Sequence, residues 1–142
     1  MYGPRSNESN GVYRLLKSAM LRNNIVYNGK PEDKREYIHV KDAACLSMKA
    51  LDDQFNNKHL VLTGIDRISA ADLFTMFKEM LNKEVTVQFN DDPIHRHYQV
   101  TPYAFSPKAG EKLVANPYID MGQGLLEVID QIYNMQTDEK YY

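Results

Sequence analysis

The sequence predicts an α/β protein that contains at least part of a parallel sheet. Segments with a 3.6-residue apolar period alternate along the chain with short segments of strand character, which is the order expected for this class. The stretch 59–64, His-Leu-Val-Leu-Thr-Gly, is mostly apolar, as in a parallel strand that is buried on both faces. The 142 residues are enough for one domain with its own core. We therefore expect a single unit that spans the whole chain.

The first half of the chain predicts two helices and two strands after an opening loop. A helix is expected over 12–20, with an apolar face made of Val12, Leu15, Leu16, Ala19 and Met20. Residues 25–27 form a short strand that the turn Asn28-Gly29 ends. After a charged loop, a second strand is expected over 36–40. Asp42 is then expected to cap a helix that runs to Leu51.

The second half predicts the clearest amphipathic helix of the chain. Ser69 and Asp72 have capping-box spacing, and apolar residues recur at the helical period behind them over 70–81. The alternation of Val85 and Val87 with polar residues predicts a half-buried strand over 84–89. The four expected strands either form a sheet that stands alone or belong to one end of a larger sheet.

The last part of the chain predicts two more helices. A polar loop precedes Ser106-Pro107, an N-cap and N1 pair that starts a short helix toward Leu113. Asp120 and Gln123 are expected to cap the final helix, and the tail over 136–142 is expected to fray.

Composition and charge exclude several classes of partner. A net charge of −2 and a pI of about 6.1 give no electrostatic basis for binding nucleic acid or an anionic membrane. No apolar run has the length of a membrane span, and the N-terminus has no signal-peptide pattern. The single cysteine, Cys45, cannot form an internal disulfide, which favours the reducing cytoplasm. Its apolar helical context predicts a buried structural thiol.

Common signatures of redox and hydrolytic chemistry are missing from the sequence. No Gly-rich turn joins a strand to a helix, as a dinucleotide-binding loop requires, and no Gly-x-Ser-x-Gly elbow occurs. Gly122-Gln123-Gly124 lies in a helix start without a preceding strand. Tyr13 and Lys17 have the Tyr-x-x-x-Lys spacing of an acid/base pair, which we interpret as a chance spacing on the first helix.

A metal site is not predicted either. His95 and His97 lie on alternate positions of an extended segment, and Asp91 and Asp92 lie nearby in the sequence. Zinc sites need three or four ligands, and no further well-spaced set stands out. We interpret the segment as a solvated loop or as a loop that covers an anionic ligand.

The segment 35–44, Arg-Glu-Tyr-Ile-His-Val-Lys-Asp-Ala-Ala, is the most informative one. It places Arg35 at the mouth of a strand that leads directly into a helix. The planar guanidinium fork suits bidentate recognition of a phosphate group. On spacing alone, it is equally expected that Arg35 is a surface residue that pairs with Glu32 or Asp33.

This segment closely resembles a motif of the NAD-dependent epimerase/dehydratase family, the extended short-chain dehydrogenases that act on nucleotide sugars. Tyr2-Gly3-Pro4-Arg5 resembles a second motif of that family. The strand that ends at Thr63-Gly64, and the helix that starts after Ser69, resemble the family's last Rossmann strand and its following helix. The stretch 98–113 resembles the C-terminal pattern of a bacterial subgroup associated with surface-polysaccharide sugars. The resemblance covers nearly all of this chain but only the C-terminal part of a family member.

The resemblance implies that several residues bind a nucleotide sugar, with a UDP-sugar as the expected ligand. Arg35 matches the arginine that contacts the diphosphate, and Arg96 lies near a second arginine that closes over the phosphates. Asn10 and Gly11 fall where the chain approaches the diphosphate before the first helix. The remaining two positions, Val26 and Tyr27, match the strand that lines the base.

The resemblance also implies what this chain does not carry. NAD is the cofactor of the intact family, and Tyr2 falls close to the position of its nicotinamide ring. The Gly-rich dinucleotide loop and the catalytic Tyr-x-x-x-Lys pair have no match here. We therefore expect a substrate-binding C-terminal portion whose N-terminal dinucleotide-binding half is absent, with no catalytic residue and no NAD binding by the chain alone. Its expected partner is that missing half or a second copy of the chain.

Two alternatives to this enzyme portion remain open at this point. One is a stand-alone binding or oligomerising module derived from the same family. A small metal-dependent enzyme built on His95 and His97 is the third hypothesis.

Overall fold

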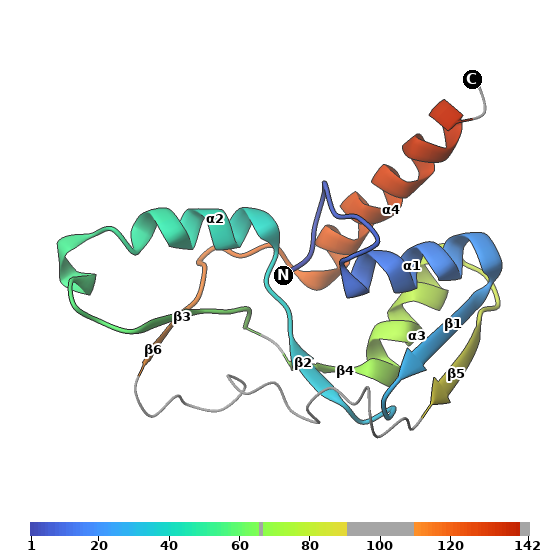
Figure 1. Cartoon of the computed structure of the whole chain (residues 1–142), viewed down its shortest axis with the longest axis horizontal. Coiled ribbons are helices and arrows are strands. Elements are labelled where there is room, and N and C mark those ends of the chain that lie inside the picture. Colours follow the sequence, from blue (N-terminus) through green and yellow to red (C-terminus); the bar gives the residue numbers. More distant parts are fainter. Residues whose placement is uncertain (66, 91–109, 140–142) are drawn as a thin grey trace.

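The computed structural model describes residues 1–65, 67–90 and 110–139. Helices and short strands follow each other along the chain and include parallel strand pairs, so the predicted α/β class is confirmed. The elements are α1 (Gly11–Arg22), β1 (Asn24–Asn28), β2 (Lys34–Glu36), α2 (Val40–Lys49), the 3-10 helix η1 (Asp53–Phe55), β3 (Leu60–Leu62), β4 (Arg67–Ser69), α3 (Ala70–Leu81), β5 (Thr86–Asn90), β6 (Glu111–Leu113) and α4 (Met121–Glu139). In Figure 1, α1, α3, β1 and β5 lie at one end of the molecule, and α2, β3 and β6 lie at the other.

The strands of the described part pair in three two-stranded sheets rather than in one four-stranded set. β1 runs parallel to β5 and places Tyr27 opposite Phe89, and β3 runs parallel to β6. β2 is antiparallel to β4 and places Arg35 opposite Ile68. Tyr2 forms an isolated parallel bridge with His39. The N-terminal segment therefore lies beside the chain that leads from β2 into α2.

The start of α2 differs from the sequence prediction. The strand expected over 36–40 lies earlier, at Lys34–Glu36, and His39 is the N-cap of the helix, with Nδ1 accepting from the Lys41 N–H at 3.4 Å. The expected cap, Asp42, lies in the first turn. Its carboxylate accepts a hydrogen bond from the Ile119 N–H at 2.9 Å, so it fixes the segment before α4 instead.

The other expected helix caps are present. Ser69 Oγ accepts from the Asp72 N–H at 3.1 Å at the start of α3, and Asp120 Oδ1 accepts from the Gln123 N–H at 3.1 Å at the start of α4. The α4 backbone continues to Glu139, beyond position 136 where the sequence places the start of a frayed tail. Among the helices of the described residues, none is both long enough and apolar enough to cross a membrane.

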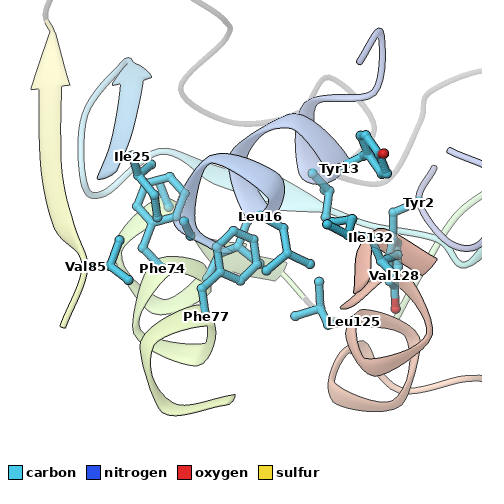
Figure 2. Close-up of a cluster of buried hydrophobic side chains, with 14 residues drawn as sticks. Tyr2, Tyr13, Leu16, Ile25, Phe74, Phe77, Val85, Leu125, Val128 and Ile132 are labelled. Carbon is cyan, nitrogen blue, oxygen red and sulfur yellow. The ribbon is translucent and has the colours of Figure 1, made fainter. Parts of the chain in front are cut away.

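The main core lies where α1, α3 and α4 meet the β1–β5 pair (Figure 2). Leu16, Phe77 and Leu125 contribute one fully buried side chain from each of the three helices. These positions belong to the apolar faces that the helical period predicts. The packing therefore follows the sequence pattern at this end of the molecule.

A smaller core lies under α2 and is made of Leu46, Phe55 and Leu113. Here two sequence predictions are wrong. Residues 111–113 form strand β6 and not the end of a helix, because the Glu111 N–H pairs with the His59 carbonyl at 2.9 Å. The expected start of that helix at Ser106-Pro107 lies outside the described residues. Cys45 is exposed rather than buried, since Leu46 provides the packed face of α2.

Glu36 joins several strands through one buried carboxylate. Its side chain is 4% exposed and accepts hydrogen bonds from Thr63 Oγ1 at 2.7 Å, Lys112 Nζ at 3.1 Å and Arg67 Nε at 3.3 Å. Burial raises the pKa of Glu36, but these hydrogen bonds outweigh it and hold the pKa below its ordinary value. The carboxylate therefore fixes the end of β2 directly after Arg35.

Candidate functional site

Arg35 lies in the middle of β2 with a half-buried side chain. Its Nη1 donates to the Lys34 carbonyl at 2.9 Å, whereas Nη2 is buried and has no hydrogen-bond partner. In the part of the chain that the structure describes, no ion pair joins Arg35 to Glu32 or Asp33. A buried guanidinium donor without an acceptor is costly. Nη2 is thus the donor of this site that most needs a hydrogen bond to an acceptor on a ligand.

Two tyrosines share the electrostatic environment of Arg35. Burial raises the pKa of the Tyr27 hydroxyl, and it raises the pKa of Tyr37 to about 12. The positive charge of Arg35 acts against the shift in both cases. Both phenols therefore stay protonated at neutral pH and remain able to donate a hydrogen bond.

Val26 and Tyr27, the two residues assigned to the base, point to opposite faces of β1. Tyr27 packs edge-on against Phe74 of α3 at 5.4 Å and against Phe89 of β5 at 6.0 Å between ring centroids. Val26 is 46% exposed and lines a separate hollow with Arg14 and Arg22. Because strand side chains alternate, the two side chains do not face one common ligand surface. The Tyr27 side chain lies on the face of β1 that packs against the core.

Asp33 is a buried carboxylate beside this region that sequence reasoning did not single out as a ligand-facing group. It is 3% exposed, its Oδ2 accepts from the Lys30 N–H at 3.0 Å, and its Oδ1 has no hydrogen-bond partner. Two hydrogen bonds of 3.0 Å attach the loop to α3, from the Ala70 N–H to the Asp33 carbonyl and from the Ala71 N–H to the Pro31 carbonyl. These hydrogen bonds therefore fix the turn between β1 and β2, and Oδ1 of Asp33 remains without a hydrogen-bond donor.

Asn10 and Gly11 lie at the N-terminus of α1, away from β2. The Asn10 side chain caps the helix by accepting from the Tyr13 N–H at 3.1 Å, and its Nδ2 donates to the Met1 carbonyl at 2.8 Å. Gly11 is exposed, with open space where a Cβ would lie. No described hydrogen bond joins either residue to Arg35. The structure thus gives two separate groups of candidate residues, one at α1 and one at β2.

Tyr2 lies at the junction of two cavities. It is 2% exposed and lines one cavity of about 560 Å³ with Asn10 and Lys41, and another of about 330 Å³ with Tyr37 and Asp42. Its hydroxyl donates to the Asp120 carbonyl at 3.4 Å. Burial, with the carboxylates of Asp120, Asp42 and Glu127, raises its pKa far above the ordinary value. Tyr2 is therefore a neutral, buried residue between the cavities.

His39 is a further residue of this junction that the sequence did not single out. Its ring is 1% exposed, lies edge-on to Tyr2 at 5.3 Å, and places Nε2 3.6 Å from Glu127 Oε2 of α4. Glu127 also accepts from Lys41 Nζ at 2.9 Å. Burial has the largest effect on the pKa of His39 and lowers it. The carboxylates of Glu127 and Asp42 oppose this shift, and the positive charge of Lys41 adds to it. His39 is therefore held neutral, with Nδ1 as the acceptor that caps α2.

Acidification is expected to destabilise the protein through His39. Its pKa in the folded state is lowered, so the unfolded chain binds a proton first as the pH falls below about 6.5, the ordinary histidine pKa. The free energy of unfolding is then expected to fall from that pH downward until the folded state also binds the proton. Urea denaturation between pH 7.5 and pH 5 at about half-unit steps measures this slope.

The variant His39→Asn provides the control for this prediction. Asparagine keeps a side-chain acceptor at the N-cap but does not titrate. The pH dependence of the variant is expected to be flatter than that of the natural protein. An equal slope in the two proteins contradicts the assignment to His39.

The other candidates from the sequence have structural roles or lie outside the described residues. Tyr13 is 3% exposed in the core, and Lys17 lies over its ring at 5.7 Å while it pairs with Glu8 at 2.6 Å. Gly124 packs against Tyr2, because a Cβ there would lie 2.5 Å from its hydroxyl. No group of three possible metal-ligating side chains occurs among the described residues. Arg96 and the His95–His97 pair fall outside them.

The fold is shared with solved structures of nucleotide-sugar enzymes. A point mutant of UDP-glucuronic acid 4-epimerase from Bacillus cereus, in complex with a fluorinated substrate analogue and NAD, superposes with a TM-score of 0.71 at 15% identity. It covers 94% of this chain, which in turn covers 43% of that protein. MoeE5 in complex with UDP-glucose and NAD gives a TM-score of 0.68 at 17% identity, with 95% and 45% covered. A GDP-L-fucose synthetase from Naegleria fowleri gives 0.64 at 15% identity, with 94% and 43% covered.

These structures confirm the expected fold, the one found in NAD-dependent epimerases and dehydratases. The chain spans less than half the length of each of these proteins, between 43% and 45%. No protein-family model matches the sequence, and no curated protein matches it significantly.

Proposed function

We propose that this chain is the nucleotide-sugar-binding region of an enzyme of the NAD-dependent epimerase/dehydratase family. The observation that carries the proposal is the buried Nη2 of Arg35, which has no acceptor within the protein. A guanidinium group donates strong, charge-assisted hydrogen bonds to phosphate oxygens. We assign Arg35 to the diphosphate of the ligand. The UDP-sugars bound in the Bacillus cereus epimerase and in MoeE5 make a UDP-sugar the first ligand to test.

The other residues of the proposed site position the ligand around that contact. We assign Tyr27 to the base and Tyr2 to the cofactor side. Asn10 and Gly11, which lie at the start of α1 apart from Arg35, would make a second and separate contact with the ligand. Of the remaining two, Val26 would contribute to the base site only through the backbone of β1, since its side chain lines a separate hollow. Arg96 lies outside the described residues and is proposed as a second phosphate contact. This binding energy, remote from the reacting carbon, would hold the sugar in reactive geometry.

The chemistry itself would come from residues other than these 142. The sequence has no dinucleotide-binding loop and no paired Tyr-x-x-x-Lys at a cofactor site. NAD would accept hydride from a sugar carbon when bound to the partner region. We therefore propose that these 142 residues bind the nucleotide sugar and are inactive by themselves. The single cysteine supports the proposal that they act in the cytoplasm.

Replacing Arg35 by alanine is expected to weaken binding of UDP-glucose by about 30-fold, as expected for the loss of a charge-assisted hydrogen bond of about 2 kcal/mol. Arg35→Lys is expected to recover only part of this loss, because an ammonium group lacks the planar fork. NMR titration of the labelled chain measures weak affinities of this kind. Arg22→Ala, which removes an exposed cation at the end of α1, serves as the matched control and is expected to bind normally. Unchanged affinity in Arg35→Ala contradicts the phosphate role.

Calorimetry with NAD tests the division of roles between this chain and its partner region. We expect no binding at micromolar NAD, so micromolar affinity contradicts the proposal. Adding a dinucleotide-binding region of the same family is expected to restore turnover, and Arg35→Ala then raises KM in the combined enzyme.

One surface feature favours the alternative function of a stand-alone oligomerising module. Met48, near the end of α2, and Leu51, just after that helix, are 68% and 73% exposed. An exposed apolar patch, if these side chains are part of one, marks an interface between proteins. Light scattering distinguishes the two candidates, because a stable oligomer that binds no nucleotide supports the alternative.

A further inference from the structure

The turn between β1 and β2, together with β2 itself, holds two buried polar atoms of opposite character. Oδ1 of Asp33 is an acceptor without a donor, and Nη2 of Arg35 is a donor without an acceptor. The residues are two positions apart, yet no ion pair joins them within the described part of the chain. Both atoms are costly to leave unpaired. A ligand that brings an acceptor to Arg35 and a donor to Asp33 satisfies them together.

Asp33 is also placed next to the residue proposed for the base. A Cβ on Gly29 would lie 2.5 Å from Asp33 Oδ2 and 2.7 Å from Cε1 of Tyr27, so the carboxylate and the ring edge both border this glycine. The charges of Arg35 and Asp33 both act on the Tyr27 hydroxyl. Asp33 thus borders Tyr27, and Asp33 and Arg35 are both near enough to the Tyr27 hydroxyl for their charges to act on it.

The proposed function gives this position a chemical meaning. If Tyr27 faces the base and Arg35 the diphosphate, the group between them is the ribose, which joins the two in every nucleoside diphosphate. Ribose hydroxyl groups donate hydrogen bonds, and carboxylates accept them in other nucleotide sites. The loop is preorganised for this contact, since the Lys30 N–H fixes the other carboxylate oxygen at 3.0 Å.

We propose that Oδ1 of Asp33 accepts a hydrogen bond from a ribose hydroxyl and makes the site selective for ribonucleoside over deoxyribonucleoside diphosphates. This inference rests on the proposed function. A site that leaves a buried carboxylate oxygen unpaired rejects the analogue that lacks the hydroxyl group. The selectivity therefore does not depend on which base or sugar is bound.

The test is an NMR titration of the complete chain with UDP, 2′-deoxy-UDP and 3′-deoxy-UDP. At least one deoxy analogue is expected to bind about tenfold more weakly than UDP, the ratio expected for one hydrogen bond. The carboxyl carbon signal of Asp33 is expected to shift with UDP and to shift less with the weaker analogue. Equal affinities for all three nucleotides overturn the inference and leave the proposed function standing. If UDP itself does not bind, the proposed function fails, and this inference fails with it.

Two variants separate the ribose contact from the phosphate contact. Asp33→Asn keeps an amide oxygen for the Lys30 N–H and is expected to bind UDP and the deoxy analogue with similar affinity. Arg35→Ala is expected to weaken both nucleotides and keep their ratio. A folded Asp33→Asn protein that still discriminates tenfold overturns the assignment. Should that variant not fold, the comparison of the three nucleotides and the Asp33 carbon signal in the natural protein decide the matter.

Discussion

Replacing Phe74 by alanine is expected to lower the free energy of unfolding by about 3–5 kcal/mol, the range for removing a large buried aromatic side chain. Phe74 is 2% exposed in the centre of α3. Its ring contacts those of Tyr27, Phe77 and Phe89, with centroids 5.4, 5.9 and 5.8 Å away. The substitution removes these contacts and leaves a cavity that the surrounding elements fill only in part. Chemical denaturation at 25 °C measures the loss.

Two comparisons give this prediction its control. Phe74→Leu keeps much of the apolar volume and is expected to lose clearly less stability. Met48→Ala truncates a side chain that is 68% exposed on α2, and it is expected to change stability by less than about 0.5 kcal/mol. A loss in Phe74→Ala no larger than that in Met48→Ala contradicts the packing described for this core.

The same substitution connects the core to the candidate site. Tyr27 is held between Phe74 and Phe89, so its ring loses one of its two aromatic neighbours in Phe74→Ala. At temperatures where the variant stays folded, nucleotide affinity is expected to fall because the Tyr27 ring is less well fixed. The position of the proposed base contact therefore depends on the same packing that stabilises the fold.

The sequence predicts the structure best where the determining interactions are local. The buried faces of α1 and α3 follow the helical period, and the Ser69 and Asp120 caps bond residues three positions away. β6 is different, because its strand character comes from pairing with β3, about fifty residues earlier in the chain. The exposed position of Cys45 likewise depends on which side of α2 the smaller core occupies.

The candidate site shows the same division between local and distant interactions. The motif around Arg35 identifies a cation at a strand, but the unpaired state of Nη2 depends on its surroundings in three dimensions. Asp33 is buried because its loop bonds to the start of α3, and His39 is buried between Tyr2 and α4. These contacts join segments far apart in the sequence. A single sequence can indicate which residue types belong to the site. No pattern in it predicts which of these residues contact each other.

Replacing Gly64 by alanine is expected to have a comparably large effect, with a loss of at least about 3 kcal/mol, at the upper end of overpacking costs. A Cβ at this position would lie far inside the van der Waals distance of the Tyr37 carbonyl oxygen and 2.9 Å from its carbonyl carbon. Both atoms are backbone, so no side-chain rotation relieves the clash. The segment after β3 would have to move away from the segment after β2.

The matched control for this substitution is Gly11→Ala. A Cβ on Gly11 meets no atom within 4 Å, and the residue lies in the first turn of α1, where alanine is well tolerated. Its stability is expected to stay within about 0.5 kcal/mol of the natural protein. Because the displaced segment follows directly on Arg35 and Glu36, Gly64→Ala is also expected to weaken UDP binding. Equal stability of the two alanine variants contradicts the close approach of these segments.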